Sequence, residues 1–283
     1  MNAQQNSSLR KAYLILHALV FCSPVAFAHD PHTFAPASTD TNGFLIHEVK
    51  SPYQSGTARI RVLMPTDAGP GNRYPVIYVL PVEPLGENRF GDGLLEIKKH
   101  HLQSKHRAIF VAPDFSQLPW YADHPTDSKI RQESYLLDCV IPFVDRTYPV
   151  QGGAAGRLLL GFSKSGWGAW SLLLRNPDKF SKAVAWDAPL MMNQVGEYGS
   201  TSVFGTQENF EKYQITRLVR ASDLGESKRL ILTGFGGFRQ DHQQMHSLLD
   251  ELKVSHEFRD ETERKHDWHS GWVPEAVGLL MAK

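Results

Sequence analysis

The sequence contains little cysteine and no excess of either charge. Its 283 residues include two cysteines, and 30 Lys and Arg residues balance 30 Asp and Glu residues. The scarcity of cysteine excludes a disulfide framework as the source of stability. Without a basic excess there is no electrostatic reason to expect binding to nucleic acid or to an anionic membrane. Low-complexity linkers and internal repeats are also missing, so we expect one globular domain.

The N-terminal segment predicts export. Arg10 and Lys11 precede an apolar run that ends in Ala-Phe-Ala at residue 28, a small-x-small pattern typical of signal-peptide cleavage. The run is short for a bilayer span, which favours cleavage over a retained anchor. We therefore expect residues 1–28 to be a secretory signal peptide. The mature protein would be periplasmic or secreted, without membrane insertion.

Removal of this segment changes what the mature chain can contain. It would take away Arg10, Lys11 and no acidic residue, so the expected net charge is about −2. Cys139 would be the one remaining cysteine, which excludes an intramolecular disulfide. It lies in an apolar helical pattern, where cysteine is typically a small buried hydrophobe.

Short β-rich runs alternate with helical segments from residue 42 onward. Two alternating runs predict an antiparallel edge pair, and the next five, nearly continuous and apolar, predict a parallel sheet buried on both faces. The segment 29–42 is rich in Pro, Thr, Ser and Asp and is expected to be a flexible arm. We predict an α/β fold over 43–283, with a mostly parallel eight-stranded sheet covered by helices on both faces. The eight expected strands are 44–51, 57–65, 74–81, 108–115, 157–162, 182–188, 229–235 and 255–261.

Ser163 lies where the fifth expected strand meets a helix. The segment from Gly161 to Ser165 reads Gly-Phe-Ser-Lys-Ser, close to the G-x-S-x-G nucleophile elbow, which needs small residues two before and two after the serine. The backbone N–H of Lys164 would point toward a developing oxyanion. Its side chain is expected to face the cleft mouth or solvent. The alternative is a serine that merely caps an ordinary helix.

A serine nucleophile needs a base, which in this architecture comes from the loop after the last strand. His256 opens that strand and is expected to be structural. His269 lies in what resembles the last helix. His266 lies in the connecting loop, so we predict that it is the base.

Two aspartates compete for the role of orienting this imidazole. After the seventh strand the first acid is Asp241, but Gln244 follows it in a capping-box pattern that explains it without catalysis. Asp187 follows the sixth strand, at the sheet edge from which Ser163 emerges. We favour Asp187 and keep Asp241 as the alternative.

Together these residues resemble the putative-esterase branch of the α/β-hydrolase superfamily, which contains esterase D, enterochelin and feruloyl esterases and the mycobacterial mycolyltransferases. The resemblance rests on the segments GFSKSGWGA, NPDKFSKAVAWDAP, DELKVSHEFRDE and HDWHSGW. It implies an α/β-hydrolase fold and supports Ser163 and His266.

The sequence departs from this family in two places. Gly236 or Gly237 stands where the familiar aspartate follows the seventh strand. The third strand ends without the usual His-Gly, so the second oxyanion N–H is expected from Val82 or Glu83.

Aromatic residues after the fourth strand are candidates for substrate binding. Trp120 and Tyr121 stand beside Asp123 and His124 and could contact a sugar or an aromatic acyl group. A loop fixed by its own aromatic side chains explains the same pattern equally well.

Two histidines, His242 and His246, stand one helical turn apart. Such a pair can bind a metal, but no third ligand is evident from the spacing. We expect both to be exposed helix histidines and predict no metal site.

The sequence thus predicts an exported serine esterase that uses Ser163, His266 and Asp187 and passes through an acyl-enzyme. No metal or organic cofactor is implied, and the expected substrate is a small-molecule or carbohydrate-linked ester. A non-catalytic binding protein with the hydrolase fold is the alternative from another class. An acyltransferase or peptidase would use the same residues.

Overall fold

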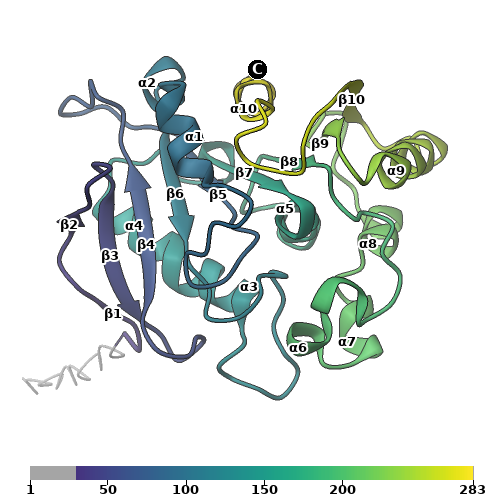
Figure 1. Cartoon of the computed structure of the whole chain (residues 1–283), viewed down its shortest axis with the longest axis horizontal. Helices are drawn as coiled ribbons and strands as arrows, with labels where there is room; N and C mark the ends of the chain where they lie inside the picture. Colours follow the sequence, from purple (N-terminus) through teal and green to yellow (C-terminus); the bar gives the residue numbers. More distant parts are fainter. Residues whose placement is uncertain (1–29, 283) are drawn as a thin grey trace, which may run out of the picture. The chain divides into compact units, whose positions relative to one another are not determined.

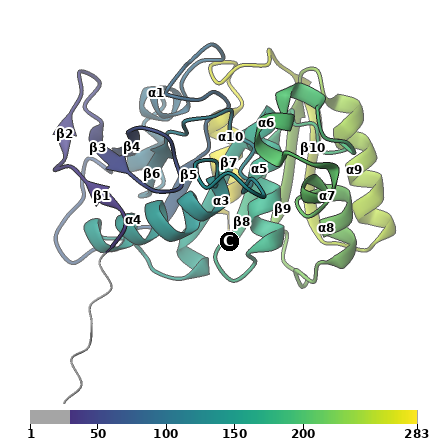
Figure 2. The same cartoon turned by 90° about the horizontal axis from the view of Figure 1, so that it is seen from below.

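A ten-stranded sheet forms the centre of the structure (Figures 1 and 2). The computed structural model describes residues 30–282, so the predicted signal peptide lies outside the described part. Residues from Pro31 onward form one compact unit. Among residues 30–282, no helix combines the length and the apolar character needed to cross a bilayer.

The strands follow the order β1-β3-β4-β6-β5-β7-β8-β9-β10, with β2 paired to β3. Pairing is antiparallel from β1 to β6 and parallel from β6 to β10. The prediction of a mostly parallel α/β sheet is therefore confirmed. The strands are β1 (Thr33–Phe34), β2 (Ser38–Thr39), β3 (Leu45–Lys50), β4 (Ala58–Leu63), β5 (Val76–Val79), β6 (Ile109–Pro113), β7 (Arg157–Phe162), β8 (Lys182–Trp186), β9 (Leu230–Phe235) and β10 (His256–Glu263).

The number of strands differs from the prediction. Eight strands lie where the sequence predicted them, and β1 and β2 are additional two-residue strands. Both fall within 29–42, where we expected a flexible arm. Phe34 stacks on Phe143 with ring centroids 4.1 Å apart. Strands this short are set by pairing with β3 and by such contacts, and they leave no periodic pattern in the sequence.

Helices cover both faces of the sheet (Figure 1). One face carries α1 (Gly93–Lys99), α2 (Leu102–Lys105) and α10 (Val273–Met281). The other carries α4 (Ile141–Thr147), α5 (Ser163–Arg175), α8 (Ile215–Ala221) and α9 (Arg239–Glu251). Shorter elements are α3 (Gln132–Ser134), which continues through a π-helical turn (Tyr135–Val140) into α4, α6 (Thr201–Phe204), α7 (Gln207–Glu211) and the 3₁₀ turns Ala154–Gly156 and Glu197–Gly199.

Alternating strand residues divide the core between these two layers. In β7, Leu159 packs into the cluster that contains Trp170 of α5. Leu158 and Leu160 pack into the cluster that contains Trp272 beside α10. This alternation is the period-two pattern of a strand buried on both faces. Cys139 is buried in the first cluster, which confirms its prediction as a core residue.

Candidate active site

Ser163 occupies a sharp turn between β7 and α5. Its φ of 52° is in the left-handed region, which costs a residue with a β-carbon of the order of 1 kcal/mol. A β-carbon at Gly161 would collide with the backbone of Ser165. The Ser165 hydroxyl bridges the N–H and the carbonyl of Phe162 at 3.0 and 2.9 Å. The turn thus has the backbone geometry of a nucleophile elbow, and it explains both small residues.

The Ser163 side chain is not a helix cap. The helix α5 begins at Ser163 itself, and Phe162 holds the cap position. Within residues 30–282 the Ser163 hydroxyl has no hydrogen-bond partner, while its backbone N–H donates to the Asp187 carbonyl at 3.2 Å. The hydroxyl is half-buried and therefore available at the carboxyl edge of the sheet.

His266 and Asp187 are in direct contact. Nδ1 of His266 lies 2.6 Å from Oδ2 of Asp187, whose side chain is fully buried. The backbone N–H groups of Gly237 and Phe238 donate to the same carboxylate at 3.0 and 2.7 Å. Burial alone would raise the pKa of Asp187, but the hydrogen bond from His266 and those from the backbone outweigh burial and hold the pKa below its ordinary value. Asp187 is therefore a charged acceptor at neutral pH.

Gly236 explains why no acidic side chain from the seventh predicted strand reaches His266. A β-carbon at this position would lie 2.6 Å from Oδ2 of Asp187. The space that an acidic side chain from β9 would enter is already filled by the carboxylate from β8. The loop after β9 contributes N–H donors to that carboxylate in place of an acid.

The ring of His266 lies beside the residue that precedes the serine. Its centroid is 5.0 Å from that of Phe162, 5.5 Å from Phe90 and 5.8 Å from Phe238. Because Nδ1 is engaged by Asp187, Nε2 is the nitrogen left for a second partner. Ser163, His266 and Asp187 thus meet at one edge of the sheet, where the strands β7, β8 and β10 end.

His269 lies elsewhere and does not contact Asp187. We expected it in the last helix, but α10 begins at Val273, so His269 belongs to the same loop as His266. Its Nδ1 lies 2.8 Å from Oε2 of Glu96, and its Nε2 accepts the N–H of Asp92 at 3.1 Å. His269 therefore links this loop to the start of α1. His256 is the first residue of β10, as predicted.

Asp241 does not form the capping box that the sequence suggested. The helix α9 begins two residues earlier, at Arg239, and Asp241 accepts the N–H of Met191 at 3.0 Å. This bond holds the loop that follows β8. Burial raises the pKa of Asp241, and the neighbouring Glu197 and Asp187 act in the same direction.

The Lys164 side chain was expected to face the cleft mouth or solvent, and the structure excludes solvent. Its side chain is 11% exposed, and Nζ lies 3.5 Å from Oε1 of Glu83, which is itself 6% exposed. Arg89 binds the same carboxylate at 2.9 Å from an exposed position. Burial lowers the pKa of Lys164, and Glu83 partly offsets this. A pairing between residues 81 positions apart leaves no local signal in the sequence.

The loop after β5 is fixed close to this ion pair. Tyr121 donates its hydroxyl to the Pro81 carbonyl at 2.6 Å, and Leu85 donates its N–H to Phe115 at 2.9 Å. Across the described part of the chain, the N–H groups of Val82 and Glu83 find no acceptor. The N–H of Lys164 lies in the first turn of α5, where such groups have no partner within the helix. Free N–H donors are therefore present on both segments that the Lys164–Glu83 ion pair joins.

Replacement of Glu83 by Gln is expected to destabilise the fold by about 3 kcal/mol, because it leaves the buried Lys164 charge without its carboxylate. Urea unfolding measures this loss. The Arg89→Gln variant is the matched control, and it should change stability by less than about 1 kcal/mol because Arg89 is 68% exposed. The combination of Glu83→Gln with Lys164→Met should regain most of the loss. Equal losses in the single and combined variants would contradict this account.

Trp120 and Tyr121 offer no face to a ligand. Both side chains are fully buried, and Trp120 packs edge-on against Trp167 at 5.5 Å. Tyr121 also fills the space in which a β-carbon at Gly168 would lie. The expectation that they bind substrate is therefore replaced by the alternative, a loop fixed by its own aromatic side chains.

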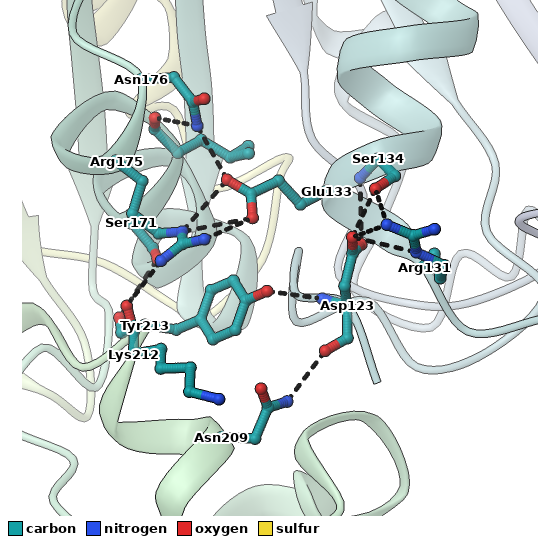
Figure 3. Close-up of polar contacts among 11 residues, drawn as sticks. Asp123, Arg131, Glu133, Ser134, Ser171, Arg175, Asn176, Asn209, Lys212 and Tyr213 are labelled. Atoms are coloured by element: carbon teal, nitrogen blue, oxygen red, sulfur yellow. Dashed lines mark hydrogen bonds and ion pairs between the residues drawn. The ribbon is translucent and has the colours of Figure 1, made fainter. Parts of the chain in front are cut away.

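A polar network around Asp123 also holds this loop (Figure 3). Asp123 accepts the N–H of Ser134 at 3.0 Å, and its own N–H donates to the Tyr213 hydroxyl at 3.1 Å. Glu133 accepts from Arg175 of α5 at 3.0 Å, beside the contacts of Asp123. These bonds join the segment after β6 to α5 and to the helices that follow β8. Asp123 thus has structural partners.

His242 is also buried, contrary to its expected exposure. Its Nε2 accepts the N–H of Ala188 at 2.9 Å, and burial lowers its pKa to about 4. It is therefore neutral and supports the residue that follows Asp187. His246, one turn later, is partly exposed, and its Nδ1 contacts His256 at 2.8 Å.

Solved structures with the same fold come from several organisms. S-formylglutathione hydrolase FrmB of Staphylococcus aureus superimposes with a TM-score of 0.67 at 17% identity, covering 84% of this chain and 98% of its own. The fluorophosphonate-binding serine hydrolase FphF of the same organism gives 0.65 at 15% identity, over 88% and 100%. The ferulic acid esterase of Anaeromyces mucronatus gives 0.58 at 16% identity, over 89% and 91%.

Comparison of the sequence with known families identifies the family of the chain. No curated protein matches the chain. The profile of the family described as Putative esterase matches residues 51–269, which is most of the chain. This agrees with the resemblance of the sequence motifs and with the α/β-hydrolase fold. The chain belongs to this esterase family and is a hydrolase of the α/β type.

Proposed function

We propose that the protein is an exported serine esterase that hydrolyses carboxylic esters through a triad of Ser163, His266 and Asp187. The observation that carries the proposal is the 2.6 Å contact between His266 and a buried, charged Asp187 at the edge where Ser163 emerges. A carboxylate that orients an imidazole beside a serine on a strained turn is the arrangement that activates a hydroxyl.

The reaction proceeds in two halves. His266 removes the proton of the Ser163 hydroxyl through Nε2 while the oxygen attacks the ester carbonyl. Asp187 stabilises the imidazolium that forms. The N–H groups of Lys164 and of Val82 or Glu83 stabilise the tetrahedral oxyanion, by about 3 kcal/mol per donor. His266 then protonates the leaving alcohol, and water hydrolyses the acyl-enzyme by the reverse sequence of proton transfers.

The buried Lys164–Glu83 ion pair has a function in this scheme. It joins the turn that carries Ser163 to the loop that carries the second oxyanion donor. Catalysis by such donors depends on their fixed position before charge develops. The pair thus keeps the two donor segments in register.

The proposed substrate is a small-molecule or carbohydrate-linked ester. Phe90 and Phe238 flank His266, and the exposed ring of Tyr198 lies 5.5 Å from Phe238. These rings, and not Trp120 and Tyr121, are the aromatic groups available near the reacting atoms. The chemistry uses no metal or organic cofactor, and the predicted signal peptide supports a periplasmic or secreted location.

A fluorophosphonate probe tests the nucleophile directly. The protein should be phosphonylated once per chain, with loss of fluoride, and peptide mass spectrometry should place the group on Ser163. Heat-unfolded protein is the control, because an inactivated serine should not react. A folded protein that resists the probe and does not hydrolyse p-nitrophenyl acetate or butyrate would favour the non-catalytic binding protein.

A further inference from the structure

Three side chains that could ligate a metal meet at the end of α9 and the start of β10. They are His246, Asp250 and His256, and their donor atoms lie within 4.8 Å of one another. His246 and Asp250 are one helical turn apart on the same face of α9. His256 follows the turn that reverses the chain into β10. Two elements thus supply two imidazoles and one carboxylate to a single point.

The hydrogen bonds of His256 fix which of its nitrogens is available. Its Nδ1 lies 2.8 Å from the carbonyl of Val254, and a carbonyl can only accept, so Nδ1 carries the proton. Its Nε2 therefore presents a lone pair toward His246. A backbone carbonyl that holds the far nitrogen of a histidine is the usual support of a metal-binding imidazole.

The contacts of His246 leave a nitrogen lone pair facing a carboxylate oxygen. Its Nδ1 lies 2.8 Å from Nε2 of His256, so with neutral rings the His246 proton must lie on Nδ1. The lone pair of its Nε2 then faces Oδ2 of Asp250 at 3.5 Å. Two donor atoms on a tetrahedral ion with bonds of about 2.0–2.1 Å are separated by about 3.4 Å. Without a cation, the Nε2 lone pair and the carboxylate repel each other. A cation bound between the two atoms replaces this repulsion with two favourable bonds.

Burial leaves the cluster both ordered and accessible. The side chain of His256 is 6% exposed and that of His246 is 34% exposed, whereas Asp250 is 63% exposed. The ring of His246 also stacks on Phe258 with centroids 4.1 Å apart. The two imidazoles are therefore held in place, and the ion and a water molecule can enter from the side of Asp250.

We propose that His246, Asp250 and His256 bind one divalent transition-metal ion of the zinc type. Two imidazole nitrogens, one carboxylate oxygen and a water molecule complete a tetrahedral set, and imidazole selects such ions over Mg²⁺ or Ca²⁺. To bind the ion through Nε2, His256 gives up the hydrogen bond that it accepts from Nδ1 of His246. Spacing in the sequence had paired His246 with His242, which points into the core.

The site is structural and separate from the proposed catalytic residues. His256 begins β10, and His266 follows its other end, roughly 23 Å further along at about 3.3 Å per residue. The ion would clamp α9 to the strand that leads to His266. Metal binding therefore acts on stability, independently of ester hydrolysis.

The test measures Zn²⁺ binding and melting temperature on the full chain after chelation and dialysis. Calorimetry should find one more tight site per chain in the wild type than in His256→Gln. Zn²⁺ at about a hundred times Kd should raise Tm by about 5 °C, whereas Mg²⁺ should not. The Asp250→Asn variant should bind Zn²⁺ at least tenfold more weakly. Because the Asp250 side chain is 63% exposed, this variant should fold like the wild type.

A matched control separates ligation from charge. Glu251→Gln removes one negative charge from the same end of α9 but leaves the cluster intact, so it should bind Zn²⁺ like the wild type. If Asp250→Asn and Glu251→Gln weaken Zn²⁺ binding equally, the effect is a general attraction of the cation to negative charge, and Asp250 is not a ligand. Identical binding by the wild type and His256→Gln would overturn the site.

Discussion

The Ser163→Ala variant is expected to lower kcat for p-nitrophenyl butyrate by about 10⁴ to 10⁶, with a small change in KM. Removal of the nucleophile abolishes the acyl-enzyme route and leaves only what the oxyanion donors and substrate binding contribute. Alanine and serine both carry a β-carbon and tolerate the φ of 52° at this position about equally, so the fold should persist. Steady-state kinetics and a thermal melt on the same preparation measure both quantities.

A second serine on α5 supplies the control. Ser171 is buried two turns further along and donates to the Tyr213 carbonyl at 3.2 Å. Ser171→Ala should cost about 1 kcal/mol of stability and leave kcat within a factor of two. An active Ser163→Ala variant, free of wild-type contamination, would remove Ser163 from the mechanism and with it the proposed triad.

The Asp187→Asn variant is expected to lower kcat about 10⁴-fold while the fold is retained. The amide of asparagine donates to Nδ1 of His266, which shifts the imidazole proton to Nε2 and blocks its use as a base. The N–H of Phe238 keeps an oxygen acceptor at the Oδ1 position, whereas the N–H of Gly237 loses the one at Oδ2 to the amide nitrogen, so the loop after β9 should stay in place with a modest loss of stability.

This variant should also change the acid stability of the protein. A carboxylate whose folded pKa is depressed stabilises the fold above its unfolded pKa near 4, and this stability is lost as pH falls through the folded value. Urea midpoints between pH 5 and 3 should therefore fall less steeply in Asp187→Asn than in the wild type.

Asp241→Asn distinguishes the two aspartates. Asparagine can still accept the N–H of Met191, so this variant should keep kcat within about threefold of the wild type. If Asp241→Asn loses activity like Asp187→Asn, both variants act by displacing the loop after β8, and the effect of Asp187→Asn cannot be assigned to the imidazole of His266. If Asp241→Asn alone is inactive, the acid has been assigned to the wrong strand.

Local patterns predicted the layers and the positions of the eight longer strands. Continuous apolar runs such as Leu158–Gly161 in β7 identify a strand buried on both faces, because both core clusters demand apolar side chains. Periodicity does not encode the order of strands. The placement of β5 between β6 and β7, and the short strands β1 and β2, depend on contacts between distant segments.

The same limit applies to the site. The turn at Ser163 and the loop position of His266 followed from short motifs, and their catalytic roles stay predictions until the variants are measured. Burial of Trp120 and Tyr121 could not be foreseen, because an aromatic pair on a loop can face either way. The solvent alternative for Lys164 was wrong for a similar reason: its partner Glu83 lies in the loop after another strand, and only the fold brings them together.

The missing β-carbon of Gly236 limits how this site can be redesigned. With Asp187 in place, an aspartate at 236 would put two carboxylates into the space of one, and without either acid the imidazole has no anchor. Moving the carboxylate from the end of β8 to the end of β9 takes two substitutions, and neither is expected to give an active protein alone. Directed evolution by single steps would have to cross an inactive intermediate, whereas a library that varies both positions together could find the alternative arrangement in one round.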